Sequence, residues 1–266
     1  MSLQRKDIIL IVDDQPANLK VLLSFLQARN FELRILQSGM RALAMLQEIT
    51  PDIILLDVLM PEMNGFETCK KIKENKSFDG VPVIFMTALD SLEDKVAGFE
   101  VGGVDYITKP FQQTEVLVRI NTHISLRKKA LKLKETQKAL LYQKKMLEAL
   151  LNSIPDPIYF KDRKNRYLGC NRAFEDLAGR QEKDIVGKTD DAVLAEDIAD
   201  SFRKKDQEML FSGTSQRTEE LVIAPDGQEI LLDILRTPYI GPNGDLLGLI
   251  GTSRNINALK QAKRHA

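Results

Sequence analysis

The chain has 266 residues, enough for two domains, and its 43% hydrophobic and 29% charged residues are typical of a soluble globular protein. Its 38 basic and 38 acidic residues cancel, so the composition shows no basic bias of the kind that marks nucleic-acid binding. No apolar run is long enough to span a membrane, and the N-terminus lacks the apolar segment of a signal peptide. The two cysteines form neither a disulfide framework nor a metal cluster, so we expect a cytoplasmic protein with reduced thiols.

Five short apolar segments alternate with helical patterns up to about residue 125. The segments are Ile8–Val12, Phe31–Leu36, Ile53–Leu56, Val83–Met86 and Tyr106–Ile107. Between them, stretches such as "PANLKVLLSFLQARN" carry apolar residues three to four positions apart, which indicates amphipathic helices. Apolar segments without alternation are typical of strands that are covered on both faces. The pattern predicts an α/β fold with a (βα)5 parallel sheet.

A helical pattern without proline or glycine then runs from Gln112 to Pro155. Within it, leucines recur at every seventh residue. The leucines are Leu126, Leu133, Leu140 and Leu147, and the alternate seam positions are Ala130, Gln137, Lys144 and Leu151. Leucine at every d position favours a two-stranded parallel coiled coil, so we predict a homodimer through this seam. Eight basic residues within residues 125–150 are interpreted as the solvated outer face of the coiled coil, in preference to a lipid or nucleic-acid site.

The character of the sequence changes after Pro155. "DPIYFKDRKNRYLGCN" predicts two short strands around a polar turn, and helical patterns follow to about Phe211. "EELVIAPDGQEILLDIL" and "PYIGPNGDLLGLIGTSRNI" then predict two hairpins with Pro-Asp-Gly and Pro-Asn-Gly turns. Strands at both ends with helices between them indicate an α+β domain on an antiparallel sheet.

Polar side chains follow the predicted parallel strands at their carboxyl ends. Asp13 and Asp14 follow the first strand, and Asp57 follows the third. Because ligands of open parallel sheets bind at this edge, we expect the three carboxylates to converge with Thr87 and Lys109, which follow the fourth and fifth strands. Clustered carboxylates repel one another unless a hard cation joins them, and Mg²⁺ prefers such an oxygen site. The sequence therefore predicts a Mg²⁺ site.

Four motifs in order, "VDDQPAN", "LLDVLMPEMNGFE", "MTALD" and "DYITKPF", resemble the receiver domain of two-component response regulators over about residues 6–125. The resemblance implies a flavodoxin-like doubly wound fold in which Asp57 accepts a phosphoryl group from a histidine kinase or phosphotransfer protein. It also implies that Mg²⁺ is held by Asp13, Asp14, Asp57 and the carbonyl of Leu59.

The same resemblance implies the roles of the remaining site residues. Thr87 and Lys109 contact the phosphoryl oxygens, the Lys109–Pro110 bond is cis, and Tyr106 turns inward when Thr87 moves. The receiver would promote its own phosphorylation and dephosphorylation, while the chain carries no ATP-binding, cyclase or DNA-binding signature. Aspartyl-phosphate hydrolases of the haloacid dehalogenase type are a poor alternative, because they place an acid where this chain has Leu59.

About residues 150–257 resemble a PAS domain, through "SIPDPIYFKDRKNRYLGCNRAF", "IVGKTDDAVL" and the hairpins, although GAF domains share this α+β plan. The resemblance implies a domain that binds a small molecule or only dimerises. The segment contains no histidine for haem, and Cys170 precedes the asparagine of "CNRAF" and so departs from the flavin motif. An apolar pocket behind Tyr159, Tyr167 and Tyr239 and ordinary core packing account for those rings equally well.

The sequence thus predicts a signalling protein in three parts: a receiver domain at 6–125, a coiled-coil linker helix at 126–152 and a PAS sensor domain at 153–257. We expect phosphorylation of Asp57 to act on a PAS dimer through the coiled coil, within a fragment of a larger sensor kinase or diguanylate cyclase. The alternative is a non-phosphorylated dimeric adaptor or scaffold that acts only by protein contacts. The crowded carboxylates favour the first interpretation, because an adaptor has no need of them.

Overall fold

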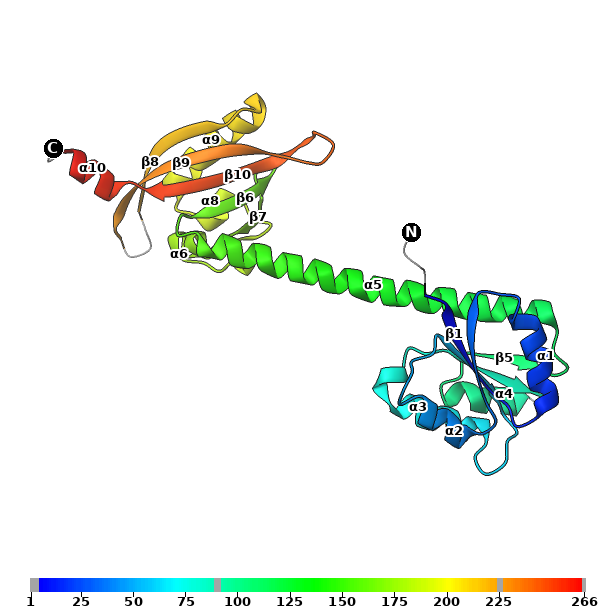
Figure 1. Cartoon of the computed structure of the whole chain (residues 1–266). Helices are drawn as coiled ribbons and strands as arrows, with labels where there is room; N and C mark the ends of the chain where they lie inside the picture. Colours follow the sequence, from blue (N-terminus) through cyan, green and yellow to red (C-terminus); the bar gives the residue numbers. More distant parts are fainter. Residues whose placement is uncertain (1–4, 89–91, 224–226, 265–266) are drawn as a thin grey trace. The chain divides into compact units, whose positions relative to one another are not determined.

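A computed structural model describes residues 5–88, 92–223 and 227–264. The chain divides into a first unit, residues 1–138, and a second unit, residues 139–266, and each is considered by itself (Figure 1). Within the described part of the chain, no helix combines the length and the apolar character needed to cross a membrane.

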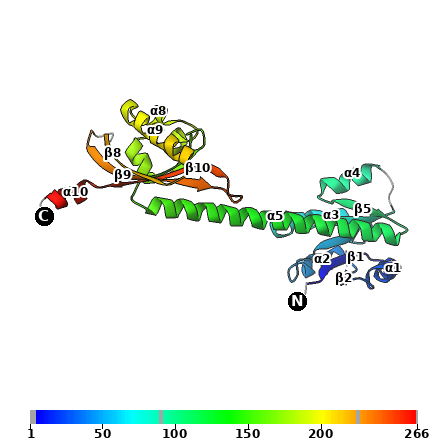
Figure 2. The same ribbon diagram turned by 90° about the horizontal axis from the view of Figure 1, so that it is seen from above.

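The first unit is a five-stranded parallel sheet with helices on both faces (Figures 1 and 2). Its elements are β1 (Asp7–Val12), α1 (Pro16–Leu26), β2 (Phe31–Leu36), α2 (Gly39–Met45), β3 (Ile53–Asp57), α3 (Gly65–Glu74), η1 (Lys76–Phe78), β4 (Val83–Thr87), α4 (Leu92–Glu100), β5 (Asp105–Thr108) and α5 (Gln113–Ser153). The strand order is β2-β1-β3-β4-β5, and all neighbouring pairs are parallel. The predicted doubly wound (βα)5 fold is confirmed.

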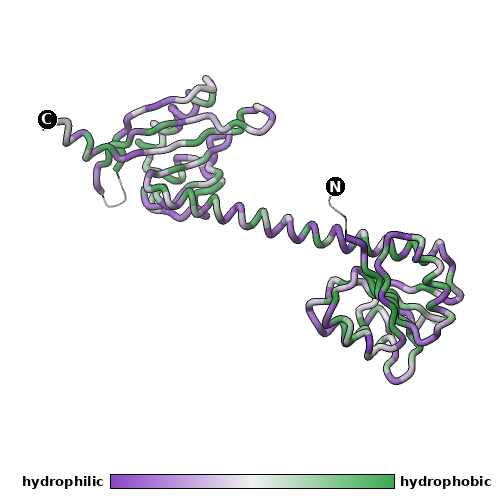
Figure 3. The backbone as a smooth tube through the Cα atoms, in the orientation of Figure 1, coloured by the Kyte–Doolittle hydropathy of each residue, from purple (hydrophilic) through white to green (hydrophobic). Residues whose placement is uncertain are grey.

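The central strands are buried on both faces, as their continuous apolar sequences predict. Every residue of β3 and β4 is buried, and Figure 3 shows hydrophobic strands gathered in the middle of the unit. Helix α1 covers one face together with the first turns of α5, while α2 and α3 cover the other. Burying both faces leaves the strand ends as the accessible edges of the sheet, and the carboxyl edge holds the acidic residues.

Helix α5 is a single helix of 41 residues, so the long helix predicted between Gln112 and Pro155 is confirmed. Its first turns pack on the sheet through Val116, Ile120 and Ile124. Beyond Ile124 its leucines are exposed: the seam positions Leu126, Leu133, Leu140 and Leu147 have exposed fractions of 55%, 59%, 65% and 60%. A helix of this length gains most of its stability by packing an apolar face, yet none of the residues that the structure describes covers this stripe.

The basic residues of α5 do not all form a solvated face. Arg127 is largely buried, donates a hydrogen bond to the carbonyl of Pro51 and lies 3.7 Å from the Asp52 carboxylate. Lys128 pairs with Asp7 at 2.6 Å. The interpretation of the basic stretch as an outer face is wrong for Arg127, which instead fixes α5 against the amino-terminal edge of the sheet.

The second unit is a five-stranded antiparallel sheet with helices. Its elements are β6 (Ile158–Asp162), β7 (Tyr167–Cys170), α6 (Arg172–Ala178), α7 (Glu182–Ile185), α8 (Asp190–Val193), α9 (Glu196–Ser212), β8 (Gln216–Ile223), β9 (Glu229–Ile240), β10 (Leu246–Asn255) and α10 (Asn257–Arg264). The strand order is β7-β6-β10-β9-β8, with every neighbouring pair antiparallel. The predicted α+β architecture is confirmed.

The two predicted hairpins share one long strand, β9, instead of using separate strands. The chain continues straight through Pro238, which pairs with Leu249 of β10. Strand β8 ends its pairing at Arg236, so Pro238 lies beyond it, where a missing N–H removes no ladder bond. Gly244 of the Pro-Asn-Gly turn has a φ of +85°, which glycine adopts readily. The Pro-Asp part of the other turn, at 225 and 226, lies outside the described residues.

Five charged side chains form a network inside the second unit, which the sequence analysis did not anticipate. Lys161, Asp190, Asp206 and Arg236 are fully buried, and Glu220 is nearly so. The Lys161 ammonium lies 2.5 Å from Asp190 and 2.6 Å from Asp206. The Arg236 guanidinium pairs with Asp206 at 2.6 Å and with Glu220 at 3.0 Å. The network therefore ties β6, β8 and β9 of the sheet to helices α8 and α9.

The tyrosine rings follow ordinary core packing. Tyr159 and Tyr167 are buried, with their ring centroids 5.9 Å apart, and both rings contact Phe174. Tyr239, on β9, is 38% exposed and does not belong to this buried cluster. The Tyr167 hydroxyl donates to Asp190 at 2.7 Å, which joins the aromatic core to the charged network.

Replacing Lys161 by methionine would leave Asp190 and Asp206 without their shared cation. Removing one partner of a buried ion pair costs about 3–5 kcal/mol, so we expect the second unit to unfold at a lower urea concentration. Amide exchange of β9 during urea unfolding reports on the second unit, and amide exchange of β4 reports on the first. The exposed Lys164→Met is the matched control; equal unfolding of the two variants would show that the network does not stabilise the fold.

Candidate functional site

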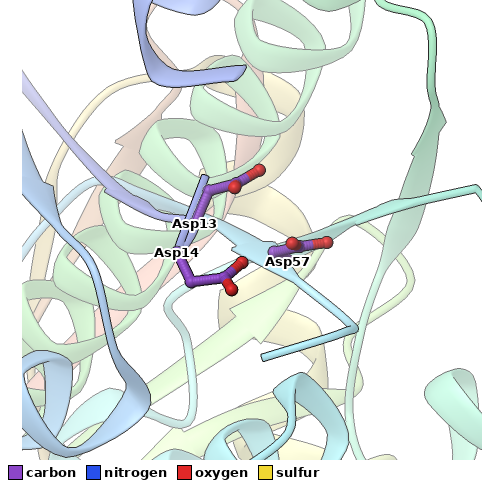
Figure 4. Close-up of side chains that lie close together, drawn as sticks. All are labelled: Asp13, Asp14 and Asp57. Carbon is purple, nitrogen blue, oxygen red and sulfur yellow. The ribbon is translucent and has the colours of Figure 1, made fainter. Parts of the chain in front are cut away.

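Three carboxylates meet at the carboxyl edge of the parallel sheet (Figure 4). Asp13 and Asp14 directly follow β1, and Asp57 is the last residue of β3, the neighbour of β1 in the sheet. Each offers an oxygen, and these oxygens all lie within 4.8 Å of one another. Asp13 and Asp57 are buried at 0% and 1% exposure. The structure brings the three predicted acids together.

Asp13 is held by neighbours at the start of α1. The backbone N–H of Gln15 donates to Asp13 Oδ1 at 2.8 Å, and the Asn18 amide donates to both carboxylate oxygens at 3.1 and 2.9 Å. Asn18 is a positioning residue that the sequence analysis missed, although it is the last residue of the "VDDQPAN" motif. The available signal was that Asn18, a short polar residue, lies in the first helical turn after the strand that carries Asp13.

Lys109 is the counter-ion of the site. It follows β5, and its ammonium lies 3.0 Å from Asp13 Oδ2 and 2.9 Å from Asp57 Oδ1. The Lys109–Pro110 bond is cis, as expected, and the Lys109 N–H donates to the carbonyl of Thr87 at 2.8 Å. Thr87 ends β4 and is 2% exposed. The ends of four neighbouring elements thus meet around Asp57.

Two carboxylate oxygens of the site lack a hydrogen-bond partner among the residues that the structure describes: Asp14 Oδ1 and Asp57 Oδ2. Burial raises the pKa of Asp57; the hydrogen bond from Lys109 opposes this shift, and the nearby charge of Asp13 adds to it. One ammonium faces three carboxylates, so negative charge remains in excess. Partnerless, clustered carboxylate oxygens fit a hard divalent cation such as Mg²⁺.

The loop after β3 lies directly against the Asp57 backbone. A Cβ on Gly65 would lie 2.2 Å from the Asp57 carbonyl oxygen, and the Gly65 N–H donates to the Val58 carbonyl at 2.9 Å. Only glycine permits α3 to begin this close to β3. Leu59 donates a backbone hydrogen bond to Asp57, and its side chain is 56% exposed beside the site.

Tyr106, the predicted switch residue, is already in a buried position. Its ring packs between Phe85 and Phe99, with centroid distances of 5.6 and 5.2 Å, and its hydroxyl donates to the Lys95 carbonyl at 2.5 Å. Gly98 leaves room for it, because a Cβ there would lie 2.0 Å from the hydroxyl oxygen. The structure therefore holds the inward orientation, and the turn from an outward one stays a prediction.

Asn171 joins the end of α5 to the sheet of the second unit. This buried side chain is the N-cap of α6, and its oxygen also accepts from the N–H of Ile158 at 2.8 Å. Its amide nitrogen donates to the carbonyls of Leu151, Ile154 and Asp156, at 3.2, 3.2 and 2.9 Å. An asparagine ahead of a helical pattern signals an N-cap, but nothing local signals the bonds to α5.

Comparison with known proteins matches residues 9–121 to the response regulator receiver domain and residues 151–261 to the PAS fold. Response regulator PleD of Caulobacter vibrioides is 41% identical over 114 residues, which are 43% of this chain and 25% of PleD. The DNA-binding dual master transcriptional regulator RpaA of Synechocystis sp. is 34% identical over 112 residues, 42% of this chain and 46% of RpaA. The chain thus spans a quarter to about half of these relatives.

Solved receiver domains resemble the same part of the chain. One is the signal receiver domain of a signal transduction histidine kinase from Syntrophus aciditrophicus, at 33% identity and a TM-score of 0.43, covering 45% of this chain and 90% of that one. The family matches confirm both predicted resemblances, and the acidic site lies within the first match. The chain therefore carries a response regulator receiver domain, at residues 9–121, followed by a PAS domain, at residues 151–261.

Proposed function

We propose that this protein acts in two-component signal transduction by accepting a phosphoryl group on Asp57 from a histidine kinase or phosphotransfer protein. The observation that supports this function best is the convergence of Asp13, Asp14 and Asp57 with Lys109 at one sheet edge. A scaffold that acts only by protein contacts, the alternative, would gain nothing from buried carboxylates whose repulsion costs stability.

The residue types suit transfer of a phosphoryl group to a carboxylate. A bond forms between phosphorus and an Asp57 oxygen as the bond from phosphorus to the donor's leaving oxygen or nitrogen breaks. Charge in such a transition state spreads over three phosphoryl oxygens, so positive charge and hydrogen-bond donors stabilise it. Lys109 places its ammonium 2.9 Å from Asp57 Oδ1, and Thr87 ends the neighbouring strand with a hydroxyl.

Asp13, Asp14 and Asp57, with the carbonyl of Leu59, would hold Mg²⁺ in this proposal. The fit rests on the partnerless oxygens of Asp14 and Asp57 and on a ligand set made only of oxygens. When bound, Mg²⁺ would supply positive charge that offsets the negative charge of the phosphoryl oxygens. Asn18 and the backbone of Gln15 orient Asp13 by hydrogen bonds.

Acetyl phosphate should transfer one phosphoryl group to the purified protein, and only when Mg²⁺ is present. Intact-mass spectrometry measures the added group, and Asp57→Asn should abolish it because the attacking carboxylate is gone. Lys109→Met should slow the labelling at least tenfold, because the developing charge then lacks its ammonium. The exposed Glu74→Gln is the control and should label like wild type. Labelling that persists in Asp57→Asn, or in EDTA, would contradict the proposal.

We further propose that the chain dimerises through Leu126, Leu133, Leu140 and Leu147 and that phosphorylation changes the packing of this seam. The supporting observation is that all four leucines are more than half exposed along one uninterrupted helix. That helix begins in the receiver domain and ends at the Asn171 junction, which gives a continuous element between the two sequence matches. A small-molecule ligand of the PAS domain stays a prediction; two of the rings expected to line its pocket, Tyr159 and Tyr167, pack within the core.

Two aspartates in the seam, Leu133→Asp with Leu140→Asp, should convert the dimer to a monomer, because the interface would bury unpaired charges. Sedimentation velocity measures the change. The matched control places aspartates on the outer positions of the repeat, Leu131→Asp with Tyr142→Asp, which are 48% and 72% exposed and should leave the dimer intact.

The same dimer allows the coupling to be measured. Beryllofluoride, a phosphoryl mimic, should alter amide exchange across residues 126–150 in the wild-type protein. If amide exchange at residues 126–150 is the same with and without the mimic, while the Asp57 site is occupied, the helix does not transmit phosphorylation and the proposed coupling is wrong.

A further inference from the structure

A shallow, largely apolar hollow of about 390 Å³ lies on the first unit at the point where α5 leaves the sheet. Its walls come from several separate parts of the chain, Lys73 of α3 among them. Leu126 and Ala130 of α5 form one wall, residues 79–82 between η1 and β4 form another, and Val104 ahead of β5 forms a third. The hollow faces away from the acidic edge, because η1, the start of β4 and the start of β5 lie at the amino-terminal end of the sheet.

The basic side chains around the hollow are already engaged with the receiver domain. Lys73 donates to the carbonyls of Asp79 and Val81 at 3.0 and 2.7 Å. His123 Nε2 lies 3.0 Å from Asp105, and Arg127 donates to the Pro51 carbonyl. Apart from exposed Asp79, the described surface that remains toward solvent is apolar and includes Leu126 at 55% and Val104 at 39% exposure. Apolar side chains exposed together in a concave site favour burial against a partner.

The hollow is continuous with the leucine seam. Leu126 is the first d position of the heptad repeat, and Ala130 is the following a position, so both residues belong to the seam and to the hollow. A partner helix packed on Leu126 and Ala130 would therefore also lie against the receiver surface beside them. The small side chain of Ala130 lets such a helix approach closely.

We infer that a second copy of this chain occupies the hollow, so that the dimer interface extends from the leucine seam onto the receiver domain at residues 79–82 and Val104. The inference rests on the dimer of the proposed function and specifies its interface. The occupant is the α5 segment near Ala130 of the second copy, and by two-fold symmetry each copy fills the hollow of the other.

The length of the seam supports this occupant. From Leu126 to Leu147 the repeat covers only about three heptads, and two of its a positions are the polar Gln137 and Lys144. Stable interfaces usually bury about 1,200–2,000 Å² in total, so contacts beyond the seam would strengthen a dimer of this kind. Charge complementarity points the same way, because exposed Asp79 borders the hollow while the incoming stretch of α5 carries Lys129 and Lys132.

Val104→Glu tests the inference away from the helix itself. Val104 lies outside the heptad repeat, so a glutamate there affects the dimer only if the hollow is part of the interface. We expect the dimer dissociation constant, measured by sedimentation equilibrium, to rise at least tenfold. Val21→Glu is the matched control, because Val21 on α1 is 40% exposed and borders neither the seam nor the hollow. Phosphoryl uptake from acetyl phosphate should be unchanged in both variants, which checks that the receiver folds.

A second measurement uses the unmodified hollow. Amide exchange at residues 79–83 should be slower in the wild-type dimer than in the monomeric Leu133→Asp, Leu140→Asp variant, because a second copy covers the segment. This comparison remains informative if Val104→Glu were to misfold.

The outcomes separate this inference from the function on which it rests. A wild-type chain that sediments as a monomer would overturn the proposed dimer and the inference together. A dimer that the two seam aspartates dissociate, but that Val104→Glu leaves intact with unchanged exchange at 79–83, would keep the seam and overturn only the hollow. Weakened binding of a histidine kinase in Val104→Glu, with the dimer intact, would assign the hollow to that other partner and would equally overturn the inference.

Discussion

Mutual repulsion among Asp13, Asp14 and Asp57 is the constraint on which the first unit depends. The parallel strand order brings the ends of β1 and β3 together, and burial prevents water from screening the charges. Lys109 offsets part of the repulsion, and Asn18 and Gln15 orient Asp13, yet oxygens of Asp14 and Asp57 lack a partner in the described structure. The excess negative charge is what makes the edge suitable for a cation and for a reaction that needs one.

In the second unit, by contrast, buried carboxylates are paired with buried cations. Lys161 and Arg236 share Asp206, and each pairs with one further carboxylate. The network therefore stabilises the contact between sheet and helices, whereas the acidic edge of the first unit stays electrostatically incomplete. Arg127 fixes the first part of α5 to the receiver sheet, and Asn171 is hydrogen-bonded to its last turn. The exposed leucines of α5 offer a surface that a second copy can cover.

The sequence predicts most of the fold and the acidic site, because both depend on local patterns. Continuous apolar strands such as Ile53–Leu56 must be covered on both faces, and residues at their carboxyl ends then meet without further information. The buried network is not predictable in this way: Lys161 lies in a short strand beside polar residues, and Asp190 and Asp206 are distant in sequence. Pro238 is a second example: a proline in the sequence predicts the end of a strand, but β9 continues through it. The reason is that β8 stops pairing at Arg236, and the sequence around Pro238 carries no information about that.

The most direct test of this account is the pH dependence of folding stability without Mg²⁺, compared between wild type and Asp57→Asn by urea unfolding. The pKa of Asp57 is raised in the folded state by burial, so the folded protein holds that proton more tightly than the unfolded chain. The protonated Asp57 therefore contributes to stability below the pKa that it has in the unfolded chain, and this contribution is lost as the pH rises through its pKa in the folded protein. Wild type should therefore lose more stability than Asp57→Asn as the pH rises above the unfolded value of about 4, and saturating Mg²⁺ should reverse that loss in wild type. Parallel stability curves for the two proteins, with no effect of Mg²⁺, would contradict the account.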